Sequence, residues 1–168
     1  KYPSRINIPI GKMEETPSTN DHLAQLCRHN KAEEFYTVVT NYQTDGKGPR
    51  VNTWEAERGK NILFSIVRYP TALEAKNQFY LSMLTAVSIV AALEKYTDGF
   101  SIKWPNDIYW KEKKIAGILI ENEVQGKYIA QSIIGIGLNV NQETFLSDAP
   151  NPVSLKQIIG TNINREEL

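Results

Sequence analysis

A chain of 168 residues, 41% of them hydrophobic and 23% charged, is long enough for one globular domain with a full core. Its 19 basic residues balance its 19 acidic residues, which excludes a global charge that would draw it to nucleic acid or to an anionic membrane. The single cysteine, Cys27, excludes an intramolecular disulfide and fits a reducing compartment.

No targeting or membrane segment is visible in the sequence. Residues 1–12 carry charges and two prolines without an apolar core, so we expect no signal peptide. The longest apolar run, residues 81–93, is too short to span a bilayer and is interrupted by hydroxyl residues. We therefore expect a soluble protein of the cytoplasm, with neither a membrane nor nucleic acid among its partners.

The first predicted elements are an edge strand and a helix. Residues 6–10 alternate in polarity and include Pro9, which edge strands tolerate. Apolar residues at helical spacing follow Ser18 and Thr19, and either hydroxyl can cap the first amides of that helix. An ordinary cap explains these residues by itself, but a helix N-terminus also receives anions and polar ligands readily.

Two strands and a long helix are predicted in the middle of the chain. Residues 35–40 are rich in aromatic and β-branched side chains and predict a strand, and residues 61–68 predict another. Residues 73–96 are the longest helix candidate, with apolar side chains over a wide surface. A surface this wide predicts a helix that is largely buried against a sheet.

Residues 43–54 have neither helical nor strand periodicity and predict a mobile loop. Gly46 and Gly48 flank Lys47, and Arg50 follows. Glycines let a backbone approach a ligand closely, and the two basic side chains could meet a phosphate or a carboxylate. A solvated loop without a ligand explains these residues equally well. The spacing excludes a P-loop and a dinucleotide-binding fingerprint.

A β-hairpin is predicted where two short apolar segments, residues 108–110 and 115–120, flank a charged four-residue turn. Asn106 and Asp107 lie at the start of the first strand, and Lys114 lies where the second strand begins. An amide, an acid and a lysine on one hairpin could form a site for a polyanion.

The last third of the chain predicts a strand at residues 128–136 and a short helix at residues 152–159. The strand ends in Gly-Ile-Gly-Leu-Asn at residues 135–139, where the glycines either mark a kink or let a ligand lie against the backbone, and Asn139 could contact a polar group. Residues 164–167 resemble a capping box, so we expect a helix to begin there and the natural protein to continue.

Taken in order, these stretches resemble the biotin–protein ligase family. Residues 103–107 (Lys-Trp-Pro-Asn-Asp) and 114–121 (Lys-Ile-Ala-Gly-Ile-Leu-Ile-Glu) are similar to the central signature of that family. The Ser-Thr-Asn at residues 18–20, the Gly-basic-Gly loop at residues 43–54 and the Gly-x-Gly-x-Asn at residues 135–139 are its other landmarks. The resemblance implies an α+β fold with a mixed β-sheet and helices largely on one face, akin to the catalytic domain of class II aminoacyl-tRNA synthetases.

The resemblance also implies one catalytic domain over residues 1–168, without the N-terminal DNA-binding domain of some members and without the small C-terminal β-barrel. The implied enzyme is an ATP-dependent ligase that forms biotinyl-5′-AMP from biotin and ATP. It then transfers biotin to a lysine of a biotin carboxyl carrier protein, from acetyl-CoA carboxylase or a similar enzyme. Mg²⁺ is the implied metal, with ligands that the sequence does not identify, and a homodimer is possible.

Site residues follow from the same resemblance. Biotin is expected to contact residues from four of the motifs, namely Ser18, Thr19, Asn20, Gln43, Gly46, Gly48, Lys114, Gly117 and Gly135. ATP is expected to contact Lys47, Arg50, Asn52, Trp54, Asn106, Asp107, Lys114 and Asn139. The implied catalytic residues are Lys114, Asp107, Lys47 and Arg50. Among them Lys114 contacts the reacting carboxylate, and Asp107 orients the incoming amine.

The glycine-rich loop departs from the family pattern. Lys47 replaces the first Arg, Pro49 occupies a common Arg position and stiffens the backbone, and Val51 stands where Gly is usual. Two other functions stay open: a lipoate– or octanoyl–protein ligase or transferase of the same fold, and a non-catalytic biotin-binding module. The Trp-Pro of residues 104–105 and the Gly-Lys-Gly loop favour biotin.

Overall fold

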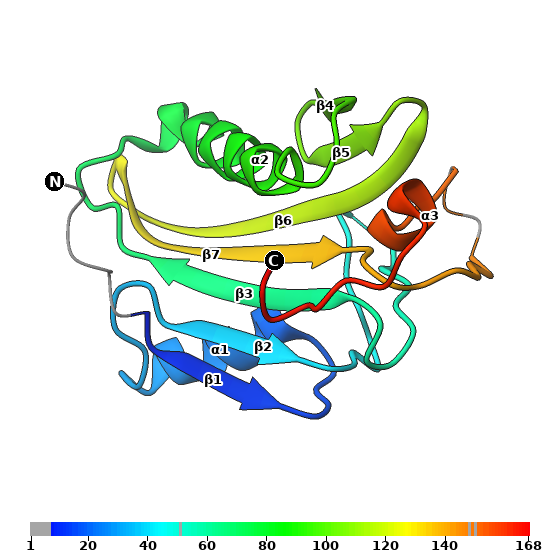
Figure 1. Cartoon of the computed structure of the whole chain (residues 1–168). Helices are drawn as coiled ribbons and strands as arrows, with labels where there is room; N and C mark the ends of the chain where they lie inside the picture. The colour runs from blue at the N-terminus through cyan, green and yellow to red at the C-terminus, as the bar shows by residue number, and fades with distance from the viewer. Residues whose placement is uncertain (1–7, 51, 148, 150) are drawn as a thin grey trace, which may run out of the picture.

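The computed structural model describes residues 8–50, 52–147, 149 and 151–168. Its centre is a seven-stranded mixed sheet with the strand order β1-β2-β3-β7-β6-β5-β4 (Figure 1). The strands are β1 (Ile10–Met13), β2 (Thr37–Thr40), β3 (Ile62–Arg68), β4 (Phe100–Lys103), β5 (Asp107–Trp110), β6 (Lys113–Gln125) and β7 (Tyr128–Leu138). The helices are α1 (Thr19–Arg28), α2 (Phe79–Leu93) and α3 (Leu155–Ile159), with a 3₁₀ turn η1 (Ala75–Asn77) before α2. Strands β1 and β2 pair in parallel, and the other neighbours pair antiparallel.

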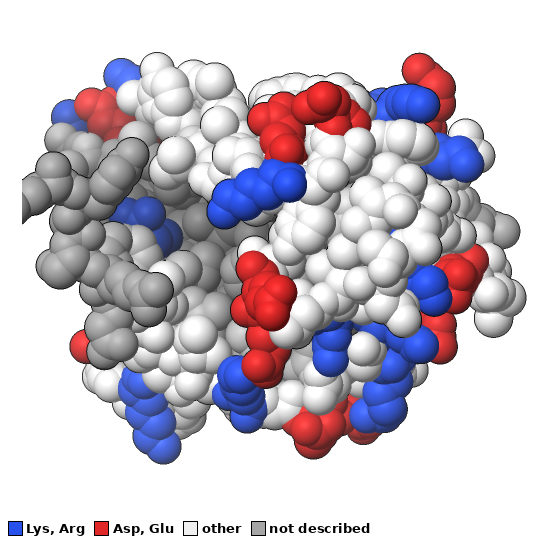
Figure 2. Space-filling model, viewed as in Figure 1, with Lys and Arg blue, Asp and Glu red and all other residues white. Residues whose placement is uncertain are grey.

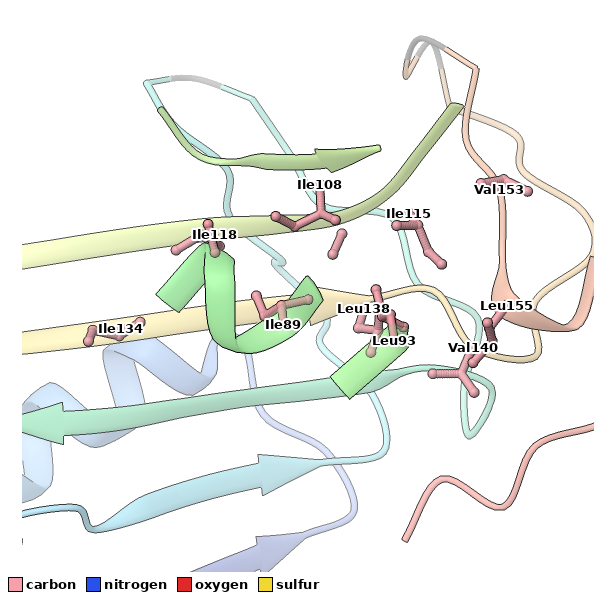
Figure 3. Packing of buried hydrophobic residues seen from close by; sticks show 12 residues of the cluster. Ile89, Leu93, Ile108, Ile115, Ile118, Ile134, Leu138, Val140, Val153 and Leu155 are labelled. Atoms are coloured by element: carbon pink, nitrogen blue, oxygen red, sulfur yellow. The ribbon is translucent and has the colours of Figure 1, made fainter. Parts of the chain in front are cut away.

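The two longer helices cover opposite faces of this sheet (Figure 1). On β7, Ile133 belongs to the apolar cluster around Leu23 of α1, whereas Ile134 belongs to the cluster around Leu93 of α2. Leu155 places α3 with α2 (Figure 3). The mixed sheet is therefore as expected. Of the three α-helices, α2 and α3 lie on one face and α1 lies on the other, because successive strand residues point to opposite sides and both sides of β7 are apolar.

Helix α2 is shorter and less buried than the sequence predicts. It covers 15 residues instead of residues 73–96, and on its outer side Tyr80, Leu84 and Val87 are 53%, 60% and 55% exposed. The prediction of a largely buried helix is wrong because the sheet covers one side of the helix only. None of the described helices is long and apolar enough to cross a membrane. On the face that carries α2, acidic and basic side chains are interspersed (Figure 2).

Three other elements differ from the predictions. The first strand occupies Ile10–Met13, and residues 6 and 7 of the predicted strand lie outside the described residues. The edge strand β4, which pairs with β5, was not predicted. Residues 165–167 form a single turn instead of a helix, closed by a hydrogen bond from the Glu167 N–H to the Asn164 carbonyl.

The predicted hairpin of β5 and β6 is confirmed, and it positions the site. Asp107 pairs with Gly117 across this hairpin, and Gly117 pairs with Gly137 on the other side. The register shifts between Ile108 and Tyr109, so that Tyr109 pairs with Lys114. These pairings bring an acid, a lysine and two glycines from three adjacent strands to one end of the sheet.

Candidate active site

A cavity of about 70 Å³ lies on the face of the sheet that carries α1, between the start of that helix, the 43–54 loop and strands β5 to β7. Its lining includes most of the predicted site residues: Ser18, Thr19, Asn20, Gln43, Lys47, Gly48, Asn52, Trp54, Asn106, Asp107, Lys114, Gly117 and Gly135. The predicted residues Gly46, Arg50 and Asn139 are not in this lining. Sequence motifs that lie between residues 18 and 137 therefore meet around one space.

The polar end of the cavity is built on the first turn of α1. Ser18 is the N-cap residue, and its hydroxyl accepts a hydrogen bond from the Asp21 N–H, as predicted. The backbone N–H and the hydroxyl of Thr19 both donate to Oε1 of Gln43, at 2.9 and 3.1 Å. With Oε1 fixed in this way, the two N–H donors on Nε2 of Gln43 stay available to a ligand.

Asn20 is part of the wall of the cavity, but its polar atoms are used within the protein. Its Nδ2 donates to the Leu119 carbonyl at 3.3 Å and to the Glu121 carboxylate at 2.7 Å, while its Oδ1 accepts from Ser65. A Cβ on Gly135 would collide with the Asn20 amide. Glycine at position 135 therefore makes room for Asn20.

The floor of the cavity is the glycine pair of β6 and β7, with Trp54 against it. A Cβ at Gly117 would lie 2.9 Å from the Trp54 ring, and a Cβ at Gly137 would overlap that ring. The sequence left open whether the glycines of residues 135–137 mark a kink or let a ligand lie against the backbone, and in this structure Gly137 makes room for the indole of Trp54. The Trp54 Nε1 is buried without a hydrogen-bond partner among the described residues.

The loop that carries Trp54 is closed on itself. The Trp54 N–H donates to the Gly46 carbonyl and the Gly48 N–H donates to the Asn52 carbonyl, both at 2.8 Å. A Cβ at Gly46 would meet the Trp54 carbonyl at 2.5 Å, so Gly46 shapes the loop from behind the cavity. Arg50 is exposed and has a positive φ of 62°. The departure at Val51 lies outside the described residues.

Beyond Trp54, the carboxylate of Glu55 accepts the backbone N–H groups of Leu146 and Ser147, at 2.7 and 2.8 Å. Burial alone would raise the pKa of Glu55. These hydrogen bonds, with one from the Ser147 side chain, outweigh burial and lower that pKa. The charged form of Glu55 therefore ties the end of the 43–54 loop to the 146–147 segment.

Lys47 and Lys114 hold different acids. The Lys47 ammonium pairs with Asp21 on α1 at 2.6 Å, and both side chains are more than two fifths exposed. The hydrogen bond to Asp21 raises the pKa of Lys47, against a lowering by burial. The Lys114 ammonium lies 2.8 Å from Oδ1 of Asp107, and these side chains are only 20% and 22% exposed. The Lys114–Asp107 distance is that of an ion pair, but the angles at the two atoms do not fit a hydrogen bond.

The Asn139 side chain lies outside the cavity lining. Asn139 is buried at the end of β7, where its N–H donates to the Ile115 carbonyl and its Oδ1 has no partner among the described residues. Across all the residues that the structure describes, no group of three or more His, Cys, Asp or Glu side chains is placed to hold a metal ion. Asp107 is the carboxylate in the cavity lining, and Mg²⁺ accepts one or two protein carboxylates together with substrate phosphates.

Comparison with known proteins agrees with this geometry. The model of the biotin/lipoate A/B protein ligase family matches residues 13–139. The bifunctional ligase/repressor BirA of Bacillus subtilis is 34% identical over 157 residues, which are 88% of this chain and 46% of that protein. The biotin–protein ligase of Homo sapiens is 30% identical over 135 residues, covering 76% of this chain and 18% of the human protein. The match spans about half the length of the bacterial relative and less than a fifth of the length of the human one.

Among solved structures, the biotin protein ligase of Aquifex aeolicus in complex with biotin and ATP is similar with a TM-score of 0.82. It is 28% identical, and the match covers 95% of this chain and 64% of that one. The mixed seven-stranded sheet of this chain thus matches the fold of a protein whose structure was solved in complex with biotin and ATP.

Proposed function

Because the chain belongs to the biotin/lipoate A/B protein ligase family, we propose that it is an ATP-dependent ligase that activates biotin as biotinyl-5′-AMP and attaches it to a carrier protein. The observation that carries this proposal is the arrangement of one cavity with two different ends. Thr19 and Gln43 offer hydrogen-bonding groups at one end, and the Lys114–Asp107 pair stands at the other. Biotin is a bicyclic urea with a carboxylate on an alkyl tail, so its urea matches the hydrogen-bonding groups and its carboxylate matches the lysine.

In the first step the biotin carboxylate attacks the α-phosphorus of ATP. A bond forms between a carboxylate oxygen and phosphorus, the bond from that phosphorus to the bridging oxygen breaks, and pyrophosphate leaves. Two anions must approach each other, so a fixed cation lowers the barrier. Lys114 is the cation for this role because its side chain is only 20% exposed and lines the cavity. To contact the substrate carboxylate it must leave Asp107.

In the second step the neutral amine of a carrier lysine attacks the carbonyl carbon of the mixed anhydride; the C–N bond forms, the bond from the carbonyl carbon to the phosphate oxygen breaks, AMP leaves, and the amine nitrogen loses one proton to solvent. Asp107 is then free of Lys114, and its carboxylate can orient the amine and accept a hydrogen bond from it. One charge pair thus supplies both steps, with Lys114 turned to the acyl phosphate and Asp107 to the nucleophile. The carrier is a biotin carboxyl carrier protein under this proposal.

Trp54 and the glycine pair keep water from the intermediate. The indole lies on Gly117 and Gly137, beside Lys114, whose ammonium is 5.7 Å from the ring centre. An acyl phosphate hydrolyses readily, so a flat aromatic cover over the tail of the substrate protects it. In this structure the ring occupies the space over Gly117 and Gly137, so the proposal requires it to move when the biotin tail enters.

The nucleotide side is supplied by the 43–54 loop and by the start of β5. Lys47, Arg50 and Asn52 are the candidates from the loop, and Asn106 is the candidate from β5. Mg²⁺ would supply positive charge to the phosphates, and Asp107, the carboxylate in the cavity lining, is the residue that would help to hold it. Lys47 can join only after it leaves Asp21, with which it pairs in this structure.

The test is ATP–pyrophosphate exchange with the purified chain. We expect exchange that depends on biotin. We also expect transfer of labelled biotin to a biotin carboxyl carrier domain, and no transfer when the acceptor lysine of that domain is replaced by arginine. Exchange with lipoate in place of biotin would favour the lipoate ligase of the same family. Tight biotin binding without exchange would favour a non-catalytic module. Light scattering under the same conditions tests the homodimer.

A further inference from the structure

Helix α2 has an apolar outer side that the sheet does not cover. The helix carries no acidic or basic residue in its 15 positions. On the sheet side four of its residues are buried: Leu81, Ala86, Ile89 and Leu93. On the outer side four apolar side chains are between 47% and 60% exposed: Tyr80, Met83, Leu84 and Val87. A helix that is apolar all round is normally buried, and an exposed apolar patch of this kind marks a protein–protein interface.

Apolar grooves run along both sides of this helix, which lies on the outside of the sheet (Figure 1). Toward β4, a groove of about 210 Å³ lies between the helix and residues 102–105, where the Trp104 side chain is 67% exposed. Toward β3 and β7, a groove of about 350 Å³ is lined mainly by apolar side chains of those strands and of the helix. The outer side of α2 is therefore a ridge between two grooves, a shape against which a second helix can pack.

A stripe of four residues on this side of α2 has charges of opposite sign at its two ends. Lys76 lies in the turn η1 before the helix, Glu94 follows the helix directly, and both are exposed. Between them, Met83 and Val87 complete the stripe with steps of seven, four and seven residues. Steps of four and seven keep residues on one side of a helix. The stripe therefore has the same spacing from either end, with a base at one end and an acid at the other.

Both charges of the stripe are available to a partner. Among the described residues Glu94 has no ion-pair partner. Lys76 pairs with Glu74 at 2.8 Å, but the Lys76 side chain is 74% exposed, and an exposed pair of this kind contributes little to stability. Two copies of the helix in antiparallel orientation place Lys76 of each copy opposite Glu94 of the other. The axis that relates the copies then passes at the level of Thr85, midway between Met83 and Val87.

We propose that the outer side of α2 is an interface between two copies of this chain, which pack antiparallel about a two-fold axis. In this dimer Met83 of each copy contacts Val87 of the other, and the pair of Lys76 with Glu94 forms twice at the rim. A two-fold interface must be self-complementary, and the stripe meets that requirement. The apolar centre supplies the affinity, and the charges set the antiparallel direction. The inference goes beyond the proposed function, because the cavity lies on the opposite face of the sheet and stays open in both copies.

Sedimentation velocity over about a hundredfold range of protein concentration measures this dimer without any ligand or activity. We expect the wild-type chain to approach the mass of two copies as its concentration rises. Val87→Glu places two like charges beside the axis and should leave only the monomer. Ile10→Glu is the matched control, because Ile10 of the edge strand β1 is 53% exposed and Val87 is 55% exposed. This control should dimerise as wild type does, and circular dichroism checks that both variants are folded.

Charge reversal tests the antiparallel direction. Lys76→Glu gives a copy with two acids on the stripe, and Glu94→Lys gives a copy with two bases. Each variant alone should dimerise about tenfold more weakly than wild type, because like charges then face each other twice. An equal mixture of the two should regain the wild-type dissociation constant within about threefold, because each rim pair of the mixed dimer joins an acid to a base. Lys31→Glu, the same charge reversal in the segment after α1, should leave the dissociation constant unchanged.

Three results would overturn the inference. The first is a wild-type chain that stays monomeric at every concentration, which would leave the outer side of α2 to a different partner. The second is a dimer that survives Val87→Glu, or that Ile10→Glu also dissociates, because the copies then meet through another surface. The third is a mixture of the two charge-reversal variants that dimerises no better than either variant alone.

Discussion

Replacing Lys114 by methionine separates its part in folding from its part in the reaction. Methionine keeps most of the volume of the side chain and removes the charge. The change leaves the Asp107 carboxylate, which is 22% exposed, without the ammonium that lies 2.8 Å away. The backbone contacts of Lys114 with Asn151 and Val153 are kept.

The structure sets the size of both effects. Breaking a fully buried ion pair by removing one partner costs about 3–5 kcal/mol. Because each side chain of this pair keeps about a fifth of its surface in water, we expect a loss of about 1–3 kcal/mol in the free energy of unfolding. The loss in catalysis should be larger. One preorganised charge contact to a transition state contributes about 10²–10³-fold in rate.

Urea unfolding and biotin-dependent exchange measure the two effects separately. In the double variant Lys114→Met with Asp107→Asn, the uncompensated carboxylate is gone, so the variant should be more stable than Lys114→Met alone. It should still show no exchange. The reasoning is refuted if Lys114→Met retains exchange within about threefold of wild type, or if the double variant recovers it.

Three further predictions follow from the loop and its contacts. Gly137→Ala places a methyl group in the space of the Trp54 ring, so we expect the unfolding free energy to fall by about 1–3 kcal/mol and the KM for biotin to rise; an unchanged KM would contradict this. Asp21→Asn breaks an exposed ion pair and releases Lys47. We expect the free energy of unfolding, measured in urea, to change by less than about 1 kcal/mol and the KM for ATP to fall. An unchanged KM for ATP would exclude Lys47 from the nucleotide site. The lowered pKa of Glu55 means that its contribution to stability is present above the ordinary carboxyl pKa and is lost as the pH falls through the lowered value, so Glu55→Gln should lose less stability than wild type on going from neutral to acidic pH. Equal losses in both proteins would contradict that assignment.

The local elements could be predicted because their signals are local. The hairpin of β5 and β6 has two short apolar segments on either side of a charged turn, all within a few residues, and both strands formed there. The edge strand β4 has four residues, mostly exposed, and its pairing with β5 defines it. Helix α2 shows the limit of periodicity. The pattern gives the width of an apolar surface but not which part of it the sheet covers.

The site was predicted from motifs and missed where a residue acts through a tertiary contact. The cavity collects most residues of the predicted set, yet Ser65 gives no signal in a strand sequence because one serine among apolar residues is common. Gly137 was seen only as part of a glycine pair, and its partner proved to be Trp54. Lys47 was expected at the nucleotide, but its neighbour Asp21 comes from α1, 26 residues away.

A crystal structure with biotin and ATP bound tests the central claim most directly. The account predicts a urea ring in contact with Thr19 and Gln43 and a biotin carboxyl, or its adenylate, within about 3 Å of the Lys114 ammonium. It also predicts that Lys114 has turned away from Asp107 and that Trp54 has moved to cover the tail. Biotin bound at another place, or a cavity still filled by Trp54 at saturating biotin and ATP, would contradict the account.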